Sequence, residues 1–182
     1  TIQVFKANMI IPQIASNLTQ SGNIDIPKKC PVCGGDTQIK EINEVKTLYC
    51  TNPDCQAKHV KSFAHFVSRD AMNIDGLSEA TLEKFIQKGF LKKFKDLYHL
   101  DRYSDDIIDM DGFGQKSYDN LIASCNRSKN TTLPKVIYGL GIANVGLSNA
   151  KMIVRQLKTV ENIINCQRQE LESIDGVGSV IA

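Results

Sequence analysis

The amino-acid sequence predicts a mostly helical protein that carries a small β zinc ribbon. Four of its six cysteines gather within 26 residues, in a pattern typical of a metal site. From residue 70 onward, a unit with helical apolar spacing around a glycine turn recurs four times. Apolar residues make up 42% and charged residues 23% of the 182 residues. This is typical of a globular chain with room for one ordinary domain or two to three small ones.

The charge of the chain limits the partners that it can bind. Lysine and arginine number 22 and aspartate and glutamate 20, for a formal net charge of +2. This balance excludes a nucleic-acid binding mode built on gross positive charge, so such contacts must be local and partly made by backbone groups. The longest apolar runs are too short to span a bilayer, and we expect no membrane partner.

The beginning of the chain predicts a strand and a linker. Range 1–14 reads as a strand, a turn and then Pro12, and range 16–29 is rich in residues typical of linkers. The sequence begins abruptly in the strand and ends inside a helical pattern. We therefore expect range 1–14 to be the end of a β domain that precedes Thr1, in a chain that is part of a longer protein.

The clustered cysteines form two pairs. Cys30 and Cys33 enclose two residues, sixteen residues follow, and Cys50 and Cys55 enclose four. This spacing is typical of a tetrahedral four-cysteine zinc site, and the two glycines after Cys33 permit the turn that such a knuckle needs. The alternatives are a disulfide pair or a redox Cys-x-x-Cys, but a redox site needs only one pair and a βαβ context, and neither fits.

The segment between the two pairs predicts a ribbon. Range 37–42 alternates as a strand does, and range 46–49 can return beside it. Four thiolates leave no open position on the ion, so we expect one structural zinc per chain rather than a catalytic metal. His59 and His65 follow the cysteines, and surface or packing roles are favoured for both over metal ligation.

The repeated unit is defined by a turn and by apolar residues at constant offsets from it. The first turn residues are Gly76, Gly112, Asn144 and Gly176, spaced by 36, 32 and 32 residues. The second turn residues, two positions later, are Ser78, Gly114, Gly146 and Gly178. Apolar residues precede each first turn residue by two positions and follow it by one, namely Ile74, Met110, Ile142 and Ile174 before it and Leu77, Phe113, Val145 and Val177 after it.

Each unit predicts a helix, a tight turn and a second helix. Upstream helices are expected over 63–69, 105–110, 132–138 and 169–173, and downstream helices from 79, 115, 147 and 179. Gly89 is the expected C-cap of the first downstream helix. The basic run 92–95 is interleaved with apolar residues, which predicts a packed connector with a solvated face rather than a binding patch.

This pattern is the helix-hairpin-helix motif. Its glycines let the turn approach a phosphate without a Cβ in the way, while N–H groups of the turn and of the next helix point at that phosphate. Such contacts position a protein on nucleic acid without reading bases. Lys116 and Lys151 add charge to the second and third units, and we expect Lys84 and Arg155 to face the same way. Alternatively, the turns merely join packed helices.

Two of the turns depart from this pattern, and neither departure removes the motif. Ser78 replaces the second glycine of the first turn, where it can cap the helix and donate to a phosphate. Asn144 replaces the first glycine of the third turn, and asparagine tolerates left-handed geometry. The sequence contains no catalytic constellation, no lysine in a nucleotidyl-transfer setting and no Walker-type loop.

Together these segments resemble the C-terminal portion of bacterial NAD-dependent DNA ligases. The segment His-Phe-Val-Ser-Arg-Asp-Ala-Met at 65–72 and the segment Leu-Gly-Ile-Ala-Asn-Val-Gly at 140–146 carry most of the resemblance. Further similar stretches lie at 4–14, 30–35, 49–55, 73–77, 96–100 and 112–117, so the resemblance covers essentially the whole chain.

The resemblance implies a division of the chain into three parts. Range 1–22 would be the end of an OB-fold and a linker, 23–60 the four-cysteine zinc finger, and 61–182 a helix-hairpin-helix DNA-binding domain whose fourth motif is incomplete. The adenylated lysine and the NAD and Mg²⁺ sites would lie outside this chain, in domains that are its partners in one polypeptide. The chain alone would be inactive, and the parent enzyme would act in the bacterial cytoplasm.

The function implied by the resemblance is non-catalytic. The chain would grip duplex or nicked DNA so that the parent ligase can seal nicks in replication and repair. An alternative is a helix-hairpin-helix and zinc module of another DNA repair or junction-binding protein. A third hypothesis is a scaffold in which the zinc and the hairpins serve protein contacts only, which predicts no salt-sensitive affinity for DNA.

Overall fold

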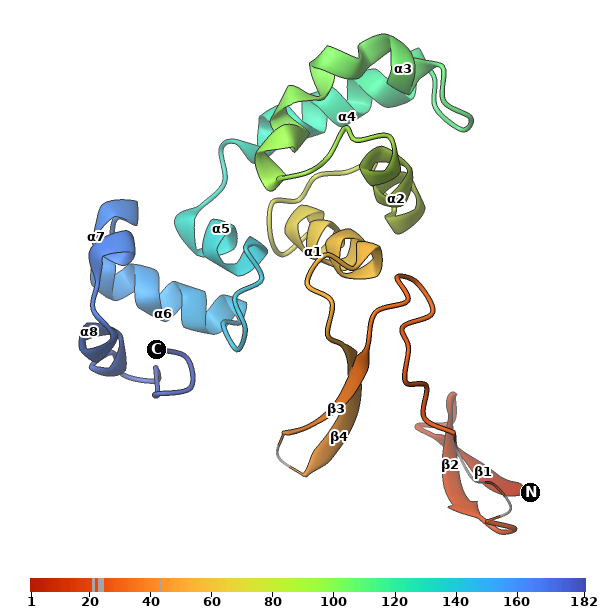
Figure 1. The fold of residues 1–182 in the computed structure, drawn as a ribbon. Coiled ribbons are helices and arrows are strands. Elements are labelled where there is room, and N and C mark those ends of the chain that lie inside the picture. Colours follow the sequence, from red (N-terminus) through yellow and green to blue (C-terminus); the bar gives the residue numbers. More distant parts are fainter. Residues whose placement is uncertain (21, 23–24, 43) are drawn as a thin grey trace. The chain divides into compact units, whose positions relative to one another are not determined.

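A computed structural model describes residues 1–20, 22, 25–42 and 44–182 of the chain (Figure 1). The backbone divides into two compact units, Thr1–Thr51 and Asn52–Ala182. The first unit consists of two hairpins and the second is helical, so the predicted mostly helical class with a small β ribbon is confirmed. The boundaries of the three predicted domains stay a prediction.

The first hairpin pairs β1 (Ile2–Ala7) with β2 (Ile11–Asn17) in antiparallel register. Asn8 and Met9 form the turn with φ angles of 50° and 62°. The predicted strand and turn are present, but a second strand runs through Pro12 and two residues into the predicted linker. Pro12 is tolerated because a two-stranded sheet has only edge strands, where a proline need not donate to a ladder.

The second hairpin pairs β3 (Thr37–Ile42) with β4 (Val45–Cys50), also antiparallel. Thr37 stands opposite Cys50 and Ile39 opposite Leu48. This hairpin is the ribbon that the alternation of 37–42 predicts. Cys50 is the last residue of β4, and it lies beside the first residue of β3.

The helical unit contains the four repeated units in order. Its elements are α1 (Gln56–Val67), α2 (Glu79–Gln87), the 3-10 helix η1 (Phe94–Tyr103), α3 (Ser104–Ile108), α4 (Gln115–Ser128), α5 (Leu133–Gly139), α6 (Leu147–Leu157), α7 (Val160–Asn165) and α8 (Arg168–Glu172). Three of the downstream helices begin at the predicted residues. At Ser179 the backbone makes one turn, in which Ile181 and Ala182 donate to the carbonyl of Gly178.

The first upstream helix differs most from its prediction. Instead of beginning at Phe63, α1 begins at Gln56, directly after the last cysteine of the cluster. The polar residues of its first two turns conceal the helical period, because only Val60 among them is buried. The helix ends at Val67, and Ser68 turns to an extended conformation.

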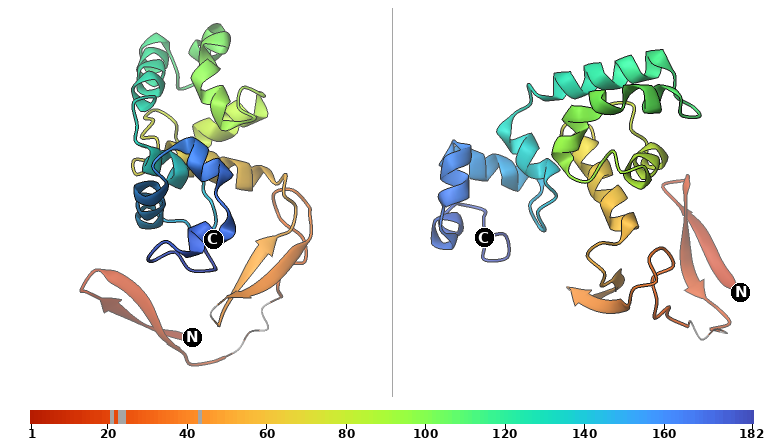
Figure 2. Two further views of the ribbon diagram at one scale, coloured as in Figure 1. Left: turned by 90° about the vertical axis from the view of Figure 1, so that its left-hand side faces the viewer. Right: turned by 45° about the horizontal axis from the view of Figure 1, so that its top comes forward.

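Two hydrophobic clusters hold the unit together. The first joins the helices of the first two repeats, and Leu82, Phe85, Leu97 and Leu121 are fully buried in it. The second joins the third and fourth repeats around Ala150, with α5 packed on α6. The repeats share these cores in pairs, as units that cannot bury their apolar faces alone do. Figure 2 draws the helices of both pairs from two further sides.

A close contact links the first two repeats to the last two. A Cβ on Gly139, at the end of α5, would lie 3.3 Å from the Cβ of Ala71 and 3.4 Å from a ring carbon of Phe66. The ring of His65 packs edge-on against that of Tyr138, with centroids 4.6 Å apart. These contacts place the third hairpin turn beside α1.

The connector between α2 and η1 is packed, as predicted. Gly89 follows the C-cap of α2 with φ +76°, and the N–H groups of Gly89 and Phe90 return to Ile86 and Phe85, which makes a Schellman motif. Phe90 and Leu91 are buried, and the ring of Phe94 stacks on Phe66 with centroids 4.3 Å apart.

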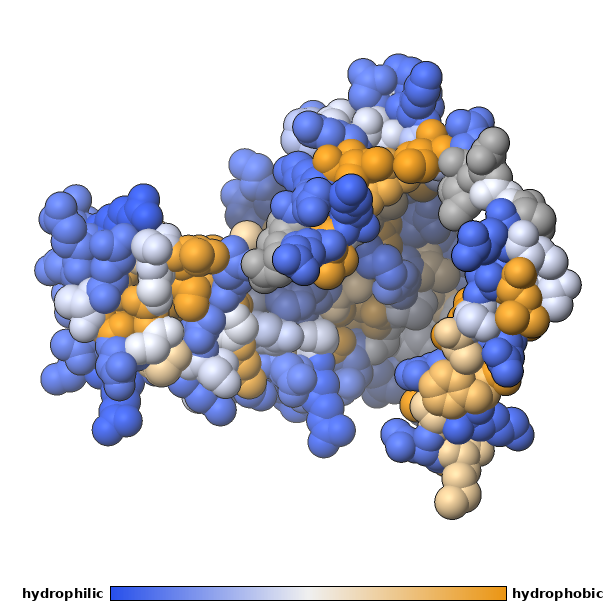
Figure 3. All heavy atoms as spheres, turned by 90° about the horizontal axis from the view of Figure 1, so that it is seen from below, coloured by the Kyte–Doolittle hydropathy of each residue, from blue (hydrophilic) through white to orange (hydrophobic). Residues whose placement is uncertain are grey.

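On the face of the molecule drawn in Figure 3, hydrophobic residues reach the surface in separate groups among hydrophilic ones. None of the described helices has the length and apolar character that crossing a membrane requires.

Candidate metal centre and nucleic-acid interface

The four clustered cysteines converge on one point. Their Sγ atoms all lie within 4.8 Å of one another. The sulfurs of Cys33 and Cys50 are 3.5 Å apart, close to the roughly 3.8 Å that a tetrahedral site with zinc–sulfur distances of about 2.3 Å requires. Cys30 is 8% and Cys55 1% exposed, whereas Cys33 and Cys50 are half-buried, so the centre is partly shielded from water.

The first cysteine pair lies on a hydrogen-bonded knuckle. The N–H of Gly34 donates to the carbonyl of Cys30 at 2.9 Å, and the N–H of Cys30 donates to the carbonyl of Gly35 at 2.8 Å. Gly34 has φ +68°, which is the left-handed geometry that glycine adopts without strain. The N–H of Gly35 reaches the Cys33 sulfur at 3.4 Å. The knuckle thus turns N–H groups towards the sulfurs.

Local hydrogen bonds also favour the thiolate form that a metal requires. Backbone hydrogen bonds from Cys33 and then from Val32 hold the pKa of the Cys30 thiol below its ordinary value. Cys55 occupies the N-cap position of α1, where the helix dipole favours negative charge.

The chemistry of this centre matches structural zinc. Four sulfurs and no further donor among the described residues make up the cluster, which leaves no open position for a substrate or a water. His59 and His65 are not members of the cluster. His65 instead donates its Nε2–H to the carbonyl of Tyr138 at 2.7 Å, in agreement with the predicted packing role.

The first residues of all four hairpin turns have left-handed geometry. Gly76, Gly112, Asn144 and Gly176 have φ angles of +91°, +81°, +64° and +82°. In turns two, three and four, the next N–H closes a hydrogen bond to the carbonyl three residues earlier, at 2.9, 3.0 and 2.9 Å. Positive φ at the third residue is what a type II turn requires, and it explains why glycine or asparagine stands there.

The glycines at the second turn position are not required by the conformation of the chain. A Cβ on Gly114, Gly146 or Gly178 would meet no atom within 4 Å, and none of these glycines has a left-handed φ. Gly114 has φ 170° and Gly146 φ −74°, conformations that any residue adopts. The protein itself therefore leaves space for a side chain at each of these three positions.

The helices after the second and third turns begin without a side-chain cap. Gly114 is the N-cap of α4 and Gly146 that of α6, and neither can accept a hydrogen bond through a side chain. The first turn is different, because Ser78 Oγ accepts from the N–H of Thr81 at 3.1 Å. The predicted capping role of Ser78 is confirmed, and the cap uses one of the donors that the other turns leave open.

The third turn differs in its apolar positions. Ile74, Met110 and Ile174 are buried two positions before their first turn residues, whereas Ile142 is 50% exposed. The apolar position that precedes the first turn residue is thus exposed in this unit alone among the four. Val145 is buried, as Leu77 and Val177 are in their units, and it packs the third turn against the second core.

Basic side chains lie near the turns. Lys116, Lys151 and Arg155 are exposed, and no ion pair holds them among the described residues. Lys84 extends from α2 to the second turn, where its Nζ lies 3.4 Å from the carbonyl oxygen of Asp111.

Sequence analysis did not identify one basic pocket. Lys58, Lys92 and Lys93 line it together with apolar side chains. Lys58 is more than thirty positions from Lys92 and Lys93 in the chain, and only the packing of the connector against α1 brings it to them.

The comparisons with known proteins agree with this architecture. The family model described as the NAD-dependent DNA ligase C4 zinc finger domain matches residues 29–57, and the helix-hairpin-helix motif model matches residues 135–182. Proteins named DNA ligase are similar over the whole chain. Those of Ruminiclostridium cellulolyticum and Lachnoclostridium phytofermentans are 55% and 56% identical, and that of Spiroplasma citri is 35% identical.

The chain spans 28% of the length of each of these three relatives. Both the zinc centre and the hairpin turns fall within the matched segments. The chain therefore corresponds to the zinc-finger and helix-hairpin-helix portion of the NAD-dependent DNA ligases.

Proposed function

We propose that the chain is the non-catalytic DNA-binding portion of an NAD-dependent DNA ligase, which grips duplex DNA through contacts between hairpin backbones and phosphates. The parent enzyme would join nicks in DNA during replication and repair. Adenylation of the enzyme by NAD, with its Mg²⁺, would take place in domains outside this chain, and the chain alone would be inactive. Its location in the bacterial cytoplasm stays a prediction.

The observation that carries this proposal is the free space at the second glycines. Gly114, Gly146 and Gly178 have conformations open to any residue and no neighbour at the Cβ position. Glycine is well tolerated at a helix N-cap, but serine, threonine, asparagine and aspartate cap at least as well, so stability alone does not require glycine three times. Close approach of an external group does, since a Cβ would keep a phosphate oxygen from the backbone N–H groups.

The electrostatics of the turns favour an anion at this point. The N-termini of α4 and α6 lack a side-chain cap, and each presents unsatisfied N–H groups with partial positive charge. Lys116 stands in the first turn of α4 and Lys151 in the second turn of α6. Both the backbone and the side chains can therefore contribute to phosphate binding at turns two and three.

We assign different weights to the four predicted contacts. Gly112, Gly114 and Lys116 would form the second contact, and Asn144, Gly146 and Lys151 the third. Gly176 and Gly178 would form the fourth. Gly76 and Ser78 would form the weakest, because Ser78 already occupies one donor of its own helix.

The zinc centre would hold the finger in its fold and take no part in chemistry. Its ligands would be Cys30, Cys33, Cys50 and Cys55, which leave no coordination position for a reacting group. The scaffold hypothesis accounts for the first turn residues, whose φ angles a turn requires, but not for the open second glycines. A junction-binding module would use the same glycines, and the similarity to ligases along the whole chain favours the ligase.

A titration of nicked duplex DNA with the zinc-loaded chain over a salt series tests the proposal. We expect affinity to fall steeply with salt, because phosphate contacts release counterions. Gly114→Ala and Gly146→Ala should each weaken binding about tenfold or more, since a hydrogen bond to a charged group contributes about 1.5–3 kcal/mol. Gly22→Ala is the matched control, because its Cβ also meets nothing within 4 Å.

The proposal fails if the unchanged chain does not bind duplex DNA at low salt. It also fails if the two alanine variants bind as tightly as the Gly22→Ala control. Zinc content and helical circular dichroism, measured on the same preparations, ensure that the compared proteins are folded.

A further inference from the structure

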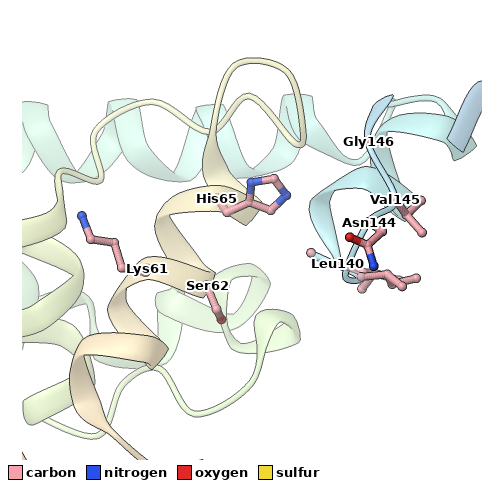
Figure 4. Close-up of a pocket in the computed structure, with 9 residues that line it drawn as sticks. Lys61, Ser62, His65, Leu140, Asn144, Val145 and Gly146 are labelled. Carbon is pink, nitrogen blue, oxygen red and sulfur yellow. The ribbon is translucent and has the colours of Figure 1, made fainter. Parts of the chain in front are cut away.

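Two grooves adjoin along helix α1. The first has a volume of about 540 Å³ and lies between α1 and the third hairpin turn (Figure 4). The second has a volume of about 420 Å³ and lies between α1 and the connector at 92–94. Ser62 lines both grooves, so the two grooves meet at this residue of α1.

The second groove has a basic rim without acidic partners. Lys58 lines it from α1, and Lys92 and Lys93 line it from the connector. No carboxylate is among the lining residues, and within the described part of the chain none of the three ammonium groups takes part in an ion pair. This distinguishes them from Lys61, whose Nζ lies 2.7 Å from a carboxylate oxygen of Glu79.

The backbone that carries two of these lysines is held in place. The N–H groups of Lys92 and Lys93 both donate to one carboxylate oxygen of Asp96, at 2.9 and 2.8 Å. These bonds hold the pKa of the Asp96 carboxyl below its ordinary value. The carboxylate thus fixes the start of η1, while both lysine side chains remain exposed.

The floor of the groove is apolar and rigid. Phe63 is buried, and its ring meets that of Phe94 edge-on with centroids 5.1 Å apart. Phe94 in turn stacks on Phe66. Pro53 completes the lining on the side of the second cysteine pair. A basic rim above an apolar floor matches a chain in which anionic and apolar groups alternate, as phosphate and deoxyribose do.

The first groove continues this surface to the hairpin. In Figure 4, Ser62 and His65 extend from α1 on the side of the turn that contains Asn144 and Gly146, while Lys61 points away from it. Lys58 and His65 are seven residues apart, which is about 10 Å along a helix. This distance corresponds to about three phosphate steps of one strand along the duplex axis.

We propose that the groove rimmed by Lys58, Lys92 and Lys93 binds the sugar–phosphate backbone of the DNA strand that the third hairpin turn contacts. The lysines pair with successive phosphates and the phenylalanine floor packs against deoxyribose. The proposal rests on the proposed function and extends the interface beyond the hairpin turns. Lys92 and Lys93 thereby acquire a binding role, in contrast to the solvated face that the sequence predicts for them.

The test compares the salt dependence of DNA binding between two triple variants of the full chain. The groove variant carries Lys58→Gln, Lys92→Gln and Lys93→Gln. The control carries Lys129→Gln, Lys135→Gln and Lys158→Gln, which remove the same charge at helix ends away from the hairpin turns and line neither groove. Both are titrated with nicked duplex DNA in increasing salt.

Loss of three phosphate contacts should lower the magnitude of the slope of log affinity against log salt by about 2.7, because each contact contributes about 0.9. The control should lower it by less than one contact. Replacing the groove lysines by arginine should restore the slope, since charge is retained. The proposal is overturned if the groove variant and the control have equal slopes.

The glycine variants distinguish this failure from that of the proposed function. If Gly114→Ala weakens binding and the groove variant behaves as the control, only the groove proposal is refuted. If the unchanged chain does not bind duplex DNA at all, both are refuted. If the groove variant has a reduced slope while the glycine variants bind normally, the hairpin contacts are refuted, and with them the assignment of the groove to the strand that the third turn contacts.

Discussion

The two glycines of the second hairpin turn should differ in how the same substitution affects the stability of the chain. Gly112 has φ +81°, where a residue with a Cβ is disfavoured by about 1–2 kcal/mol. Gly114 has φ 170° and an open Cβ position, so alanine there adds no strain. Alanine also restricts the unfolded chain, which stabilises by about 0.4–1 kcal/mol at a compatible site.

Combining these terms leaves Gly112→Ala destabilised by about 1 kcal/mol. At Gly114 the restriction of the unfolded chain is offset by the poorer N-cap preference of alanine, so Gly114→Ala should leave stability nearly unchanged. For a chain of 182 residues, the first value corresponds to a decrease in Tm of about 2–4 °C. Urea and thermal unfolding of the zinc-loaded chain, followed by circular dichroism, measure both changes. Gly114→Ala should nevertheless weaken DNA binding, because its Cβ blocks the phosphate without altering the turn.

The third turn supplies the control for this reasoning. Asn144 occupies the position of Gly112 with φ +64°, so Gly112→Asn should cost less stability than Gly112→Ala. If Gly114→Ala lowers stability as much as Gly112→Ala does, the second glycine has a structural role that the Cβ geometry does not reveal. The distinction between the two glycines would then be wrong.

Three further predictions concern the metal centre and single side chains, and a fourth concerns pH. A strong chelator should release one zinc per chain and unfold the ribbon while the helical signal persists, because the helices have cores of their own. A zinc assay and circular dichroism measure this, and loss of the helical signal together with the zinc would contradict it. Ser78→Ala should lower the free energy of unfolding by about 1 kcal/mol, because the N–H of Thr81 loses its acceptor; an unchanged urea midpoint would exclude the cap. Burial raises the pKa of Cys125 to about 11, so in the native chain this thiol should resist alkylation at pH 8, as mass spectrometry can verify. The Asp96 carboxyl has a lowered pKa from two backbone N–H donors, so its stabilisation is present above the ordinary pKa of 3.8 and is lost as pH falls through the lower folded value; Asp96→Asn should therefore reduce stability at pH 7, and reduce it less at the acid end of the titration.

The zinc centre and the hairpin turns are the parts that the sequence predicts best. Both rest on local chemistry. The spacing of Cys30 and Cys33 requires a knuckle, and Gly34 supplies its left-handed residue. The same holds for Asn144, whose position in the repeat predicts a left-handed conformation that the structure confirms. Chemistry within a few residues decides these features, so they can be predicted without a tertiary fold.

Other features depended on packing and escaped sequence analysis. The early start of α1 at Gln56 is concealed by polar residues that one buried Val60 anchors to the core. The η1 helix was not predicted, and only its first two residues fall in the predicted connector at 92–95. The α7 helix was not predicted either, since none of its residues is buried to mark a period. Ile142 is exposed whereas its equivalents Ile74, Met110 and Ile174 are buried, so the third unit keeps only Val145 as a buried apolar residue of its turn.

The sequence by itself determined where metal and hairpin turns lie, because thiol ligands and left-handed residues are properties of single positions and short spacings. Only the tertiary structure decided which glycines the protein itself requires, since the open space at Gly114 and the contact of 2.9 Å between a Cβ on Gly176 and Met152 depend on distant neighbours. It also decided that Lys58 meets Lys92 and Lys93, because the aromatic contacts of Phe94 hold the connector against α1. A binding surface of this kind is a property of packing, and no local pattern encodes it.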